Sequence, residues 1–188
     1  MKKLAVLLAA LLAAAPVFAG NTGYVKLSLW DDIAVAAPNN IHNITGLDLG
    51  IGSKAETVDG VQLDLIYAEA HKVRGVKEAI YNPADIVYGL QGGIVTLNRQ
   101  DMRGVQGGLV AISKGSVQGV QWGYVNLALE GQVTGLQAGL VNYANEFTGL
   151  QLGLVNYAKH INQGLQLGLV NIAKNGWLPV MIIVNGRF

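Results

Sequence analysis

The chain has 188 residues, of which 51% are hydrophobic and only 13% are charged, about half the charged share of an ordinary soluble domain. With 13 basic and 12 acidic residues it has no excess of positive charge, so we expect no nucleic-acid partner. Cysteine is absent, so an exported form of the chain would be held together without disulfides.

Residues 1–19 have the features of a cleaved secretory signal peptide. Two lysines precede a short apolar run, and Val17-Phe18-Ala19 offers small residues at the positions before a cleavage site at Gly20. The run is shorter than the roughly 20 apolar residues that span a bilayer, and Pro16 interrupts it. We therefore expect export, followed by a single repeat-built β domain over residues 20–188.

Most of this domain repeats one phrase about every 15 residues. The clearest copies resemble Gly-Leu-Gln-x-Gly-Leu-Val-Asn and begin at Gly119, Gly135, Gly149 and Gly164, and fainter copies begin at Gly46, Gly60, Gly75, Gly89 and Gly104. A repeat this short cannot bury its own apolar face. The copies must therefore stack or pair into one continuous body.

Within each copy, polar and apolar residues alternate with period two, which predicts a strand and fails the helical template. The residue two positions after the first glycine is polar in every copy: Asp48, Gln62, Lys77, Gln91, Gln106, Gln121, Gln137, Gln151 and Gln166. An apolar residue two positions before the glycine lies on the same strand face. The opposite face is a row of apolar side chains, of which Trp122 and Tyr124 are the largest.

Two all-β architectures fit this pattern. In the first, the strands form an antiparallel meander that closes into a small outer-membrane β-barrel of about 8–10 strands, with leucines toward lipid and the polar row lining the interior. In the alternative, each copy is one coil of a parallel β-solenoid, with leucines stacked inside and Gln and Asn ladders along the body. The scarcity of charge, the export signal and the strand ending at Phe188 favour the barrel. The common phase of all copies favours the solenoid.

We expect no catalytic, cofactor-binding or metal site. His42, His71 and His160 share no ligand spacing with cysteines or carboxylates. The glycine runs that begin at Gly89 and Gly104 lack the lysine, the Ser/Thr and the following helix of a phosphate loop.

Two further groups of side chains have structural interpretations. Asp48, Gln62, Asp64 and Lys77 share one strand face, and we interpret them as an interior polar plug, since buried charges need partners. The aromatic residues Trp122, Tyr124, Tyr143 and Tyr157 suit a belt at a membrane interface. In a solenoid they would instead offer stacking platforms for sugars.

The repeats between Gly46 and Asn171, the segment Ser28-Leu29-Trp30 and the ending Gly176–Phe188 resemble exported repeat proteins of diderm bacteria built on Gly-Leu-Gln-x-Gly-Leu-Val/Ile-Asn. That resemblance implies an outer-membrane or surface location and no established activity. We expect a non-enzymatic outer-membrane or surface protein with a structural or narrow-pore role, whose partners are outer-membrane lipid and the barrel-assembly machinery. The alternative is a secreted or surface-bound solenoid that acts as a binding or adhesion module.

Overall fold

The computed structural model describes residues 21–31, 33–34 and 41–188; the expected signal peptide lies outside these residues. The strands are β1 (Thr22–Trp30), β2 (Ile33–Ala34), β3 (Asn43–Asn98), β4 (Met102–Ser113), β5 (Val117–Ala138), β6 (Val141–Leu152), β7 (Val155–Ala173) and β8 (Val180–Arg187). Within this described part, no helix is long and apolar enough to cross a membrane.

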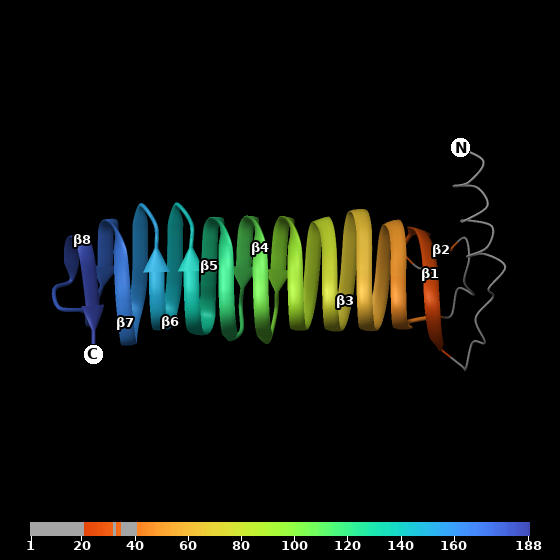
Figure 1. The fold of residues 1–188 in the computed structure, drawn as a ribbon, viewed down its shortest axis with the longest axis horizontal. Coiled ribbons are helices and arrows are strands. Elements are labelled where there is room, and N and C mark those ends of the chain that lie inside the picture. Colours follow the sequence, from red (N-terminus) through yellow and green to blue (C-terminus); the bar gives the residue numbers. More distant parts are fainter. Residues whose placement is uncertain (1–20, 32, 35–40) are drawn as a thin grey trace.

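Successive segments of the chain pair in parallel and in register, so the fold is a β-solenoid (Figure 1). Gly89 lies beside Gly104, which lies beside Gly119 in the next coil. β3 contains 56 residues because its extended chain continues from one coil into the next. Among the described strands, antiparallel pairing joins β1 to β2 and β7 to β8, at the two ends of the body in Figure 1.

The expected antiparallel barrel is therefore wrong, and the alternative parallel solenoid is confirmed. The shared phase of the repeats has a physical reason. When neighbouring strands run in the same direction, each side chain stacks on its equivalent in the next coil. Gln106 pairs in register with Gln121, for example, and Asn142 pairs with Asn156.

The chain turns at a glycine with positive φ in every repeat. These nine corner glycines have φ between 129° and 157°: Gly46, Gly60, Gly75, Gly89, Gly104, Gly119, Gly135, Gly149 and Gly164. A side chain at these positions would be strained by the backbone angle and would also collide with the preceding coil. A Cβ atom on Gly119 would lie 2.1 Å from the backbone oxygen of Gly104. The first glycine of each repeat is thus required by the backbone.

Behind each corner, four side chains of the coil point inward. In one coil these are Val133, Gln137, Asn142 and Ala144, all of which are completely buried. From Val117 to Ala173 the interior therefore contains one column of larger apolar residues, one of alanines and two of amides. Buried amides are tolerated only when they are hydrogen-bonded.

The glutamine column forms a ladder of hydrogen bonds that runs from coil to coil. Gln121 Nε2 donates to Gln106 Oε1 at 3.1 Å, and Gln137 Nε2 donates to Gln121 Oε1 at 2.7 Å. The next two rungs, Gln151 to Gln137 and Gln166 to Gln151, measure 2.6 and 2.7 Å. Each donor lies one coil after its acceptor.

The asparagine column forms a second ladder in the opposite direction. Asn126 Nδ2 donates to Asn142 Oδ1, Asn142 to Asn156, and Asn156 to Asn171, each at 2.8 Å. In this ladder each donor lies one coil before its acceptor. The alternation of the sequence assigns these asparagines to the leucine face. They point inward because the chain bends before them, where two consecutive residues such as Leu154 and Val155 both face outward.

The leucines lie on the outside, so the part of the solenoid alternative that placed them inside is wrong. Leu140, Leu154 and Leu169 are 48–62% exposed. Val133 and Gln137 share one face of their strand, so burying the valine also buries the glutamine and turns the leucines outward. The ladder hydrogen bonds offset the desolvation of the amides.

Candidate functional site

The predicted polar row lies inside the solenoid. All nine members of this row, of which Asp48 is the first and Gln166 the last, are at most 2% exposed. Between Gln106 and Gln166 the amides hydrogen-bond to one another, so this part of the row is structural. The glutamine and asparagine ladders between residues 106 and 171 are thus buried and do not offer a surface to a partner.

Near the N-terminal end, the interior holds charged groups in place of amides. The Asp48 carboxylate accepts hydrogen bonds from Ser53 at 2.5 Å, Ser28 at 3.0 Å and Gln62 at 3.2 Å. Burial raises the pKa of Asp48, although these bonds and the Lys26 ammonium act in the opposite direction. Lys26 itself donates to Ser53 Oγ at 3.2 Å.

Asp64 and Lys77 continue this interior cluster but are less well matched. Asp64 is 6% exposed, and neither of its carboxylate oxygens accepts a hydrogen bond. Lys77 donates to the backbone oxygens of Ala68 and Pro83 and to Asn82 Oδ1. Desolvation raises the pKa of Asp64 to about 7 and lowers the pKa of Lys77 to about 7. The cluster resembles a polar plug with an unsatisfied carboxyl group.

Alanine occupies the equivalent position of the next coil, at Ala79. Replacing Asp64 with alanine is expected to stabilise the fold by about 1–3 kcal/mol at pH 8, because a buried carboxyl group without a hydrogen-bond partner is removed. The folded-state pKa of about 7 lies above the ordinary aspartate value of 3.8, so ionisation of Asp64 opposes folding above about pH 7. This penalty fades as the pH falls from 7 toward 4. Denaturant midpoints at pH 8 and pH 4 measure it.

The matched control is Glu78→Ala, which removes an exposed carboxylate from the next coil. This control should change stability by less than about 0.5 kcal/mol at both pH values. An Asp64→Ala stability difference that is the same at pH 8 and pH 4 would contradict the assignment of the penalty to ionisation.

The outside of the solenoid has two sides of different character. Between residues 60 and 173, the outward residues at one to eight positions after each corner glycine form what we call the apolar flank. Its exposed members include Leu109, Trp122, Leu140, Leu154 and Leu169. Glu78 is the only exposed residue of this flank that is charged at neutral pH. From Leu63 to Leu169 the flank is roughly 34 Å long, at ~4.8 Å per coil.

The remainder of each coil, which we call the polar flank, carries the outward-facing charges of residues 59–174 other than Glu78. Arg99 bonds to Glu69 at 3.1 Å and to Asp85 at 3.0 Å, and Arg74 bonds to Asp59 at 3.0 Å. Exposed pairs of this kind contribute about 0–1 kcal/mol each. The charged residues therefore make this flank of the solenoid hydrated, in contrast to the apolar flank.

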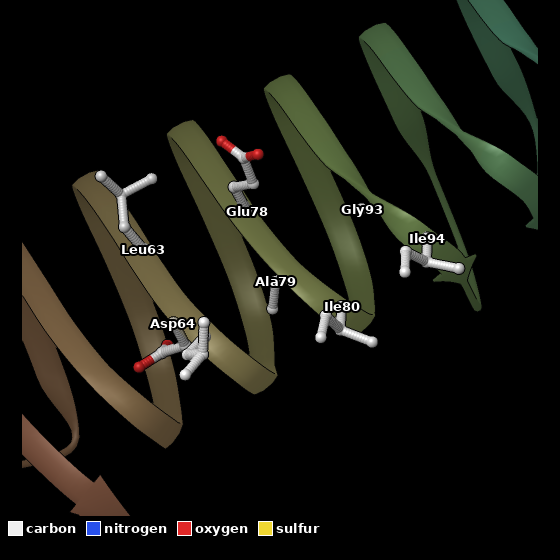
Figure 2. A pocket seen from close by; sticks show the side chains of 8 residues that line it. Leu63, Asp64, Glu78, Ala79, Ile80, Gly93 and Ile94 are labelled. Carbon is white, nitrogen blue, oxygen red and sulfur yellow. The ribbon is translucent and has the colours of Figure 1, made fainter.

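A trough crosses the N-terminal half of the apolar flank. The residues four positions after the corner glycine form its floor: Asp64, Ala79, Gly93, Gly108 and Gly123. Leu63, Glu78 and Trp122 belong to one wall; Leu65, Ile80, Ile94, Leu109 and Tyr124 form the other. Two adjoining cavities of about 520 and 330 Å³, both lined by Gly93, make up the trough. In Figure 2, Leu63 and Glu78 stand on one side of the first cavity and Ile80 and Ile94 on the other, with Ala79 between them.

The structure does not bring the histidines together. His71 lies on the polar flank, where its Nδ1 is 2.6 Å from Asp85 Oδ2, His160 lies on the same flank, and His42 lies next to the start of β3. In the parts of the chain that the structure describes, no group of three His, Cys, Asp or Glu residues is arranged to hold a metal ion.

The aromatic residues singled out in the sequence lie on the apolar flank. Trp122 and Tyr124 are 66% and 61% exposed at the C-terminal end of the trough. Tyr143 and Tyr157 stack with ring centroids 5.2 Å apart. The sequence interpretation missed the trough itself. Its signal was the pair Gly92 and Gly107, which stand where the clearest copies carry larger residues such as Trp122 or Leu152.

Comparison of the chain with protein-family models, curated proteins and solved structures finds no match.

Proposed function

We propose that this protein is a non-enzymatic, exported surface module that binds a lipid surface through its apolar flank. The observation that carries the proposal is the length of that flank, a strip roughly 34 Å long at ~4.8 Å per coil, on which Glu78 is the only exposed charged residue. Apolar patches larger than a few hundred Å² are rare on soluble monomers and mark sites of protein or membrane interaction.

Several features favour lipid as the partner. The polar flank on the remainder of each coil makes the whole body amphipathic, as for helices that lie in the membrane interface. Parallel pairing from coil to coil satisfies backbone groups without water. Exposed Trp122 and Tyr124 are residue types enriched at membrane interfaces. The resemblance to exported repeat proteins agrees with a location where such a membrane is present.

Lysine substitutions test the flank. The variant Leu140→Lys/Leu154→Lys/Leu169→Lys is expected to reduce partitioning onto neutral liposomes at least about hundredfold, since burial of each leucine contributes about 1.5–3 kcal/mol. Flotation of the purified protein with liposomes measures this, and circular dichroism checks that the β structure is retained. The matched control, Gln118→Lys/Thr134→Lys/Gln163→Lys, adds the same charge to exposed positions on the polar flank and should float like the unmodified protein.

Two results would overturn the proposal. In the first, the unmodified protein remains in the buffer fraction. In the second, both lysine variants float equally well. If the unmodified protein forms oligomers without liposomes and only the leucine variant is monomeric, the flank is a contact between copies of the chain.

A further inference from the structure

The trough exists because one of its walls is interrupted by two glycines. Residues three positions after the corner glycine form this wall in the order Leu63, Glu78, Gly92, Gly107 and Trp122. At the two glycines no side chain stands beside the floor. The space left there joins the cavity beside Glu78 to the cavity beside Trp122.

The fold does not require these two glycines. Neither has a positive φ. A Cβ atom on Gly92 would come no closer than 3.8 Å to any neighbour, and one on Gly107 no closer than 3.7 Å, which is ordinary contact. The floor glycines differ, since a Cβ on Gly93 would lie 2.2 Å from the oxygen of Ala79. Gly92 and Gly107 therefore create space that the backbone does not need.

The charge of the trough is confined to one end. Glu78 is the only charged residue in its walls, and Asp64 borders the same cavity from the floor with no hydrogen-bond partner on either oxygen. The opposite end is apolar and aromatic, with Leu109, Trp122 and Tyr124 around the second cavity. From Glu78 to Trp122 the trough crosses three strand spacings, roughly 14 Å.

We propose that the trough binds a single amphiphile with a cationic amine head group, whose alkyl chain lies over Gly92 and Gly107 and whose amine lies beside Glu78. The cavity volumes lie in the range of ligand pockets, and an apolar lining with a charged group at one end orients such a molecule. This site lies within the apolar flank, but it does not require the flank to bind a membrane, so it can be correct whether or not the proposed function is.

Decylamine, decanol and decanoate form a matched set of probes, titrated below the concentrations at which they aggregate. In a Trp30→Phe/Trp177→Phe background, Trp122 is the only tryptophan, so its emission reports binding at the trough. Binding should shift that emission to the blue. Decylamine should bind about two- to fivefold more tightly than decanol, because an exposed ion pair with Glu78 adds only a small binding energy. Decanoate should bind most weakly, since its carboxylate would be repelled by Glu78. The variant Glu78→Gln should reduce the preference for the amine, and at pH 6, where Asp64 is mostly protonated, should remove it.

Filling the trough distinguishes a site from general adsorption to an apolar surface. Gly92→Leu/Gly107→Leu should weaken decylamine binding at least about tenfold, because each excluded methylene reduces affinity roughly fourfold. The matched control Ala138→Leu adds a leucine in the same column outside the trough and should leave binding unchanged. If decylamine only adsorbs to the flank, its binding should strengthen in the filled variant, and that result would overturn the proposed site. Equal affinities for decylamine and decanoate would overturn it as well.

The flotation assay separates this proposal from the proposed function. The filled variant carries two additional leucines on the apolar flank, so it should still bind liposomes if the flank binds lipid. Loss of decylamine binding with retained flotation supports both assignments. Decylamine binding by a protein that does not float supports the trough alone.

Discussion

Replacing Gly135 with alanine is expected to destabilise the fold by about 3 kcal/mol or more. At this corner glycine φ is 132°, and a Cβ atom would lie 2.1 Å from the backbone oxygen of Gly119 in the preceding coil. A disfavoured backbone conformation costs about 1–3 kcal/mol, and the collision with the neighbouring coil adds to that. Denaturant unfolding of the purified variant measures the loss.

Gly107→Ala is the matched control, since a Cβ atom there would be no closer than 3.7 Å to any neighbour. Its effect should stay within about 0.5 kcal/mol. Similar losses in the two variants would show that glycine matters for a general reason, such as chain entropy, and would contradict the role assigned to the corner.

The second large effect concerns the glutamine ladder. Gln137→Glu is expected to destabilise the fold by about 3–5 kcal/mol at neutral pH, the usual cost of an uncompensated buried charge. Gln137 Nε2 donates to Gln121 Oε1 at 2.7 Å and to the backbone oxygen of Tyr143 at 3.2 Å. A carboxylate has no proton for either acceptor and would repel both. Thermal and denaturant unfolding at pH 7 report the loss.

The loss should depend on pH with a definite sign. Burial raises the pKa of the introduced carboxyl group above its unfolded value, so the penalty is complete above the folded pKa and declines as the pH falls toward the unfolded pKa. The variant should therefore approach the stability of the unmodified protein near pH 4. Gln118→Glu, at an exposed position on the polar flank, introduces the same charge and should have little effect at either pH. A pH-independent loss in Gln137→Glu would point to packing rather than charge.

The alternation of the sequence predicts which residues share a face, but not the direction of neighbouring strands. Val133 and Gln137 lie two residues before and two residues after Gly135, and the period of two assigns both to the same face. Parallel and antiparallel neighbours have the same period of two along the chain. The positive φ at residues such as Gly135 could not be predicted either, since it is a backbone angle that glycine permits without requiring.

The alternation also fails to predict two further features, the inward direction of the asparagines and the trough. Asn156 points inward because the chain bends at Leu154 and Val155, and one bend reverses the alternation for all residues that follow in the coil. The trough depends on side chains that are missing at Gly92 and Gly107. In the sequence alone, these two glycines look the same as those that the backbone requires.

The two amide ladders of the interior have opposite polarity. Glutamines donate toward the N-terminal end and asparagines toward the C-terminal end, as in Gln137 to Gln121 and Asn142 to Asn156. Each ladder accordingly leaves one free acceptor at its own terminus, Gln166 Oε1 at one end and Asn126 Oδ1 at the other. In an α-helix the peptide dipoles add along the axis, whereas here the side-chain dipoles of the two columns point in opposite directions. Each further coil with one glutamine and one asparagine would add side-chain dipoles of opposite direction, so the ladders do not build up an axial dipole as a lengthening helix does.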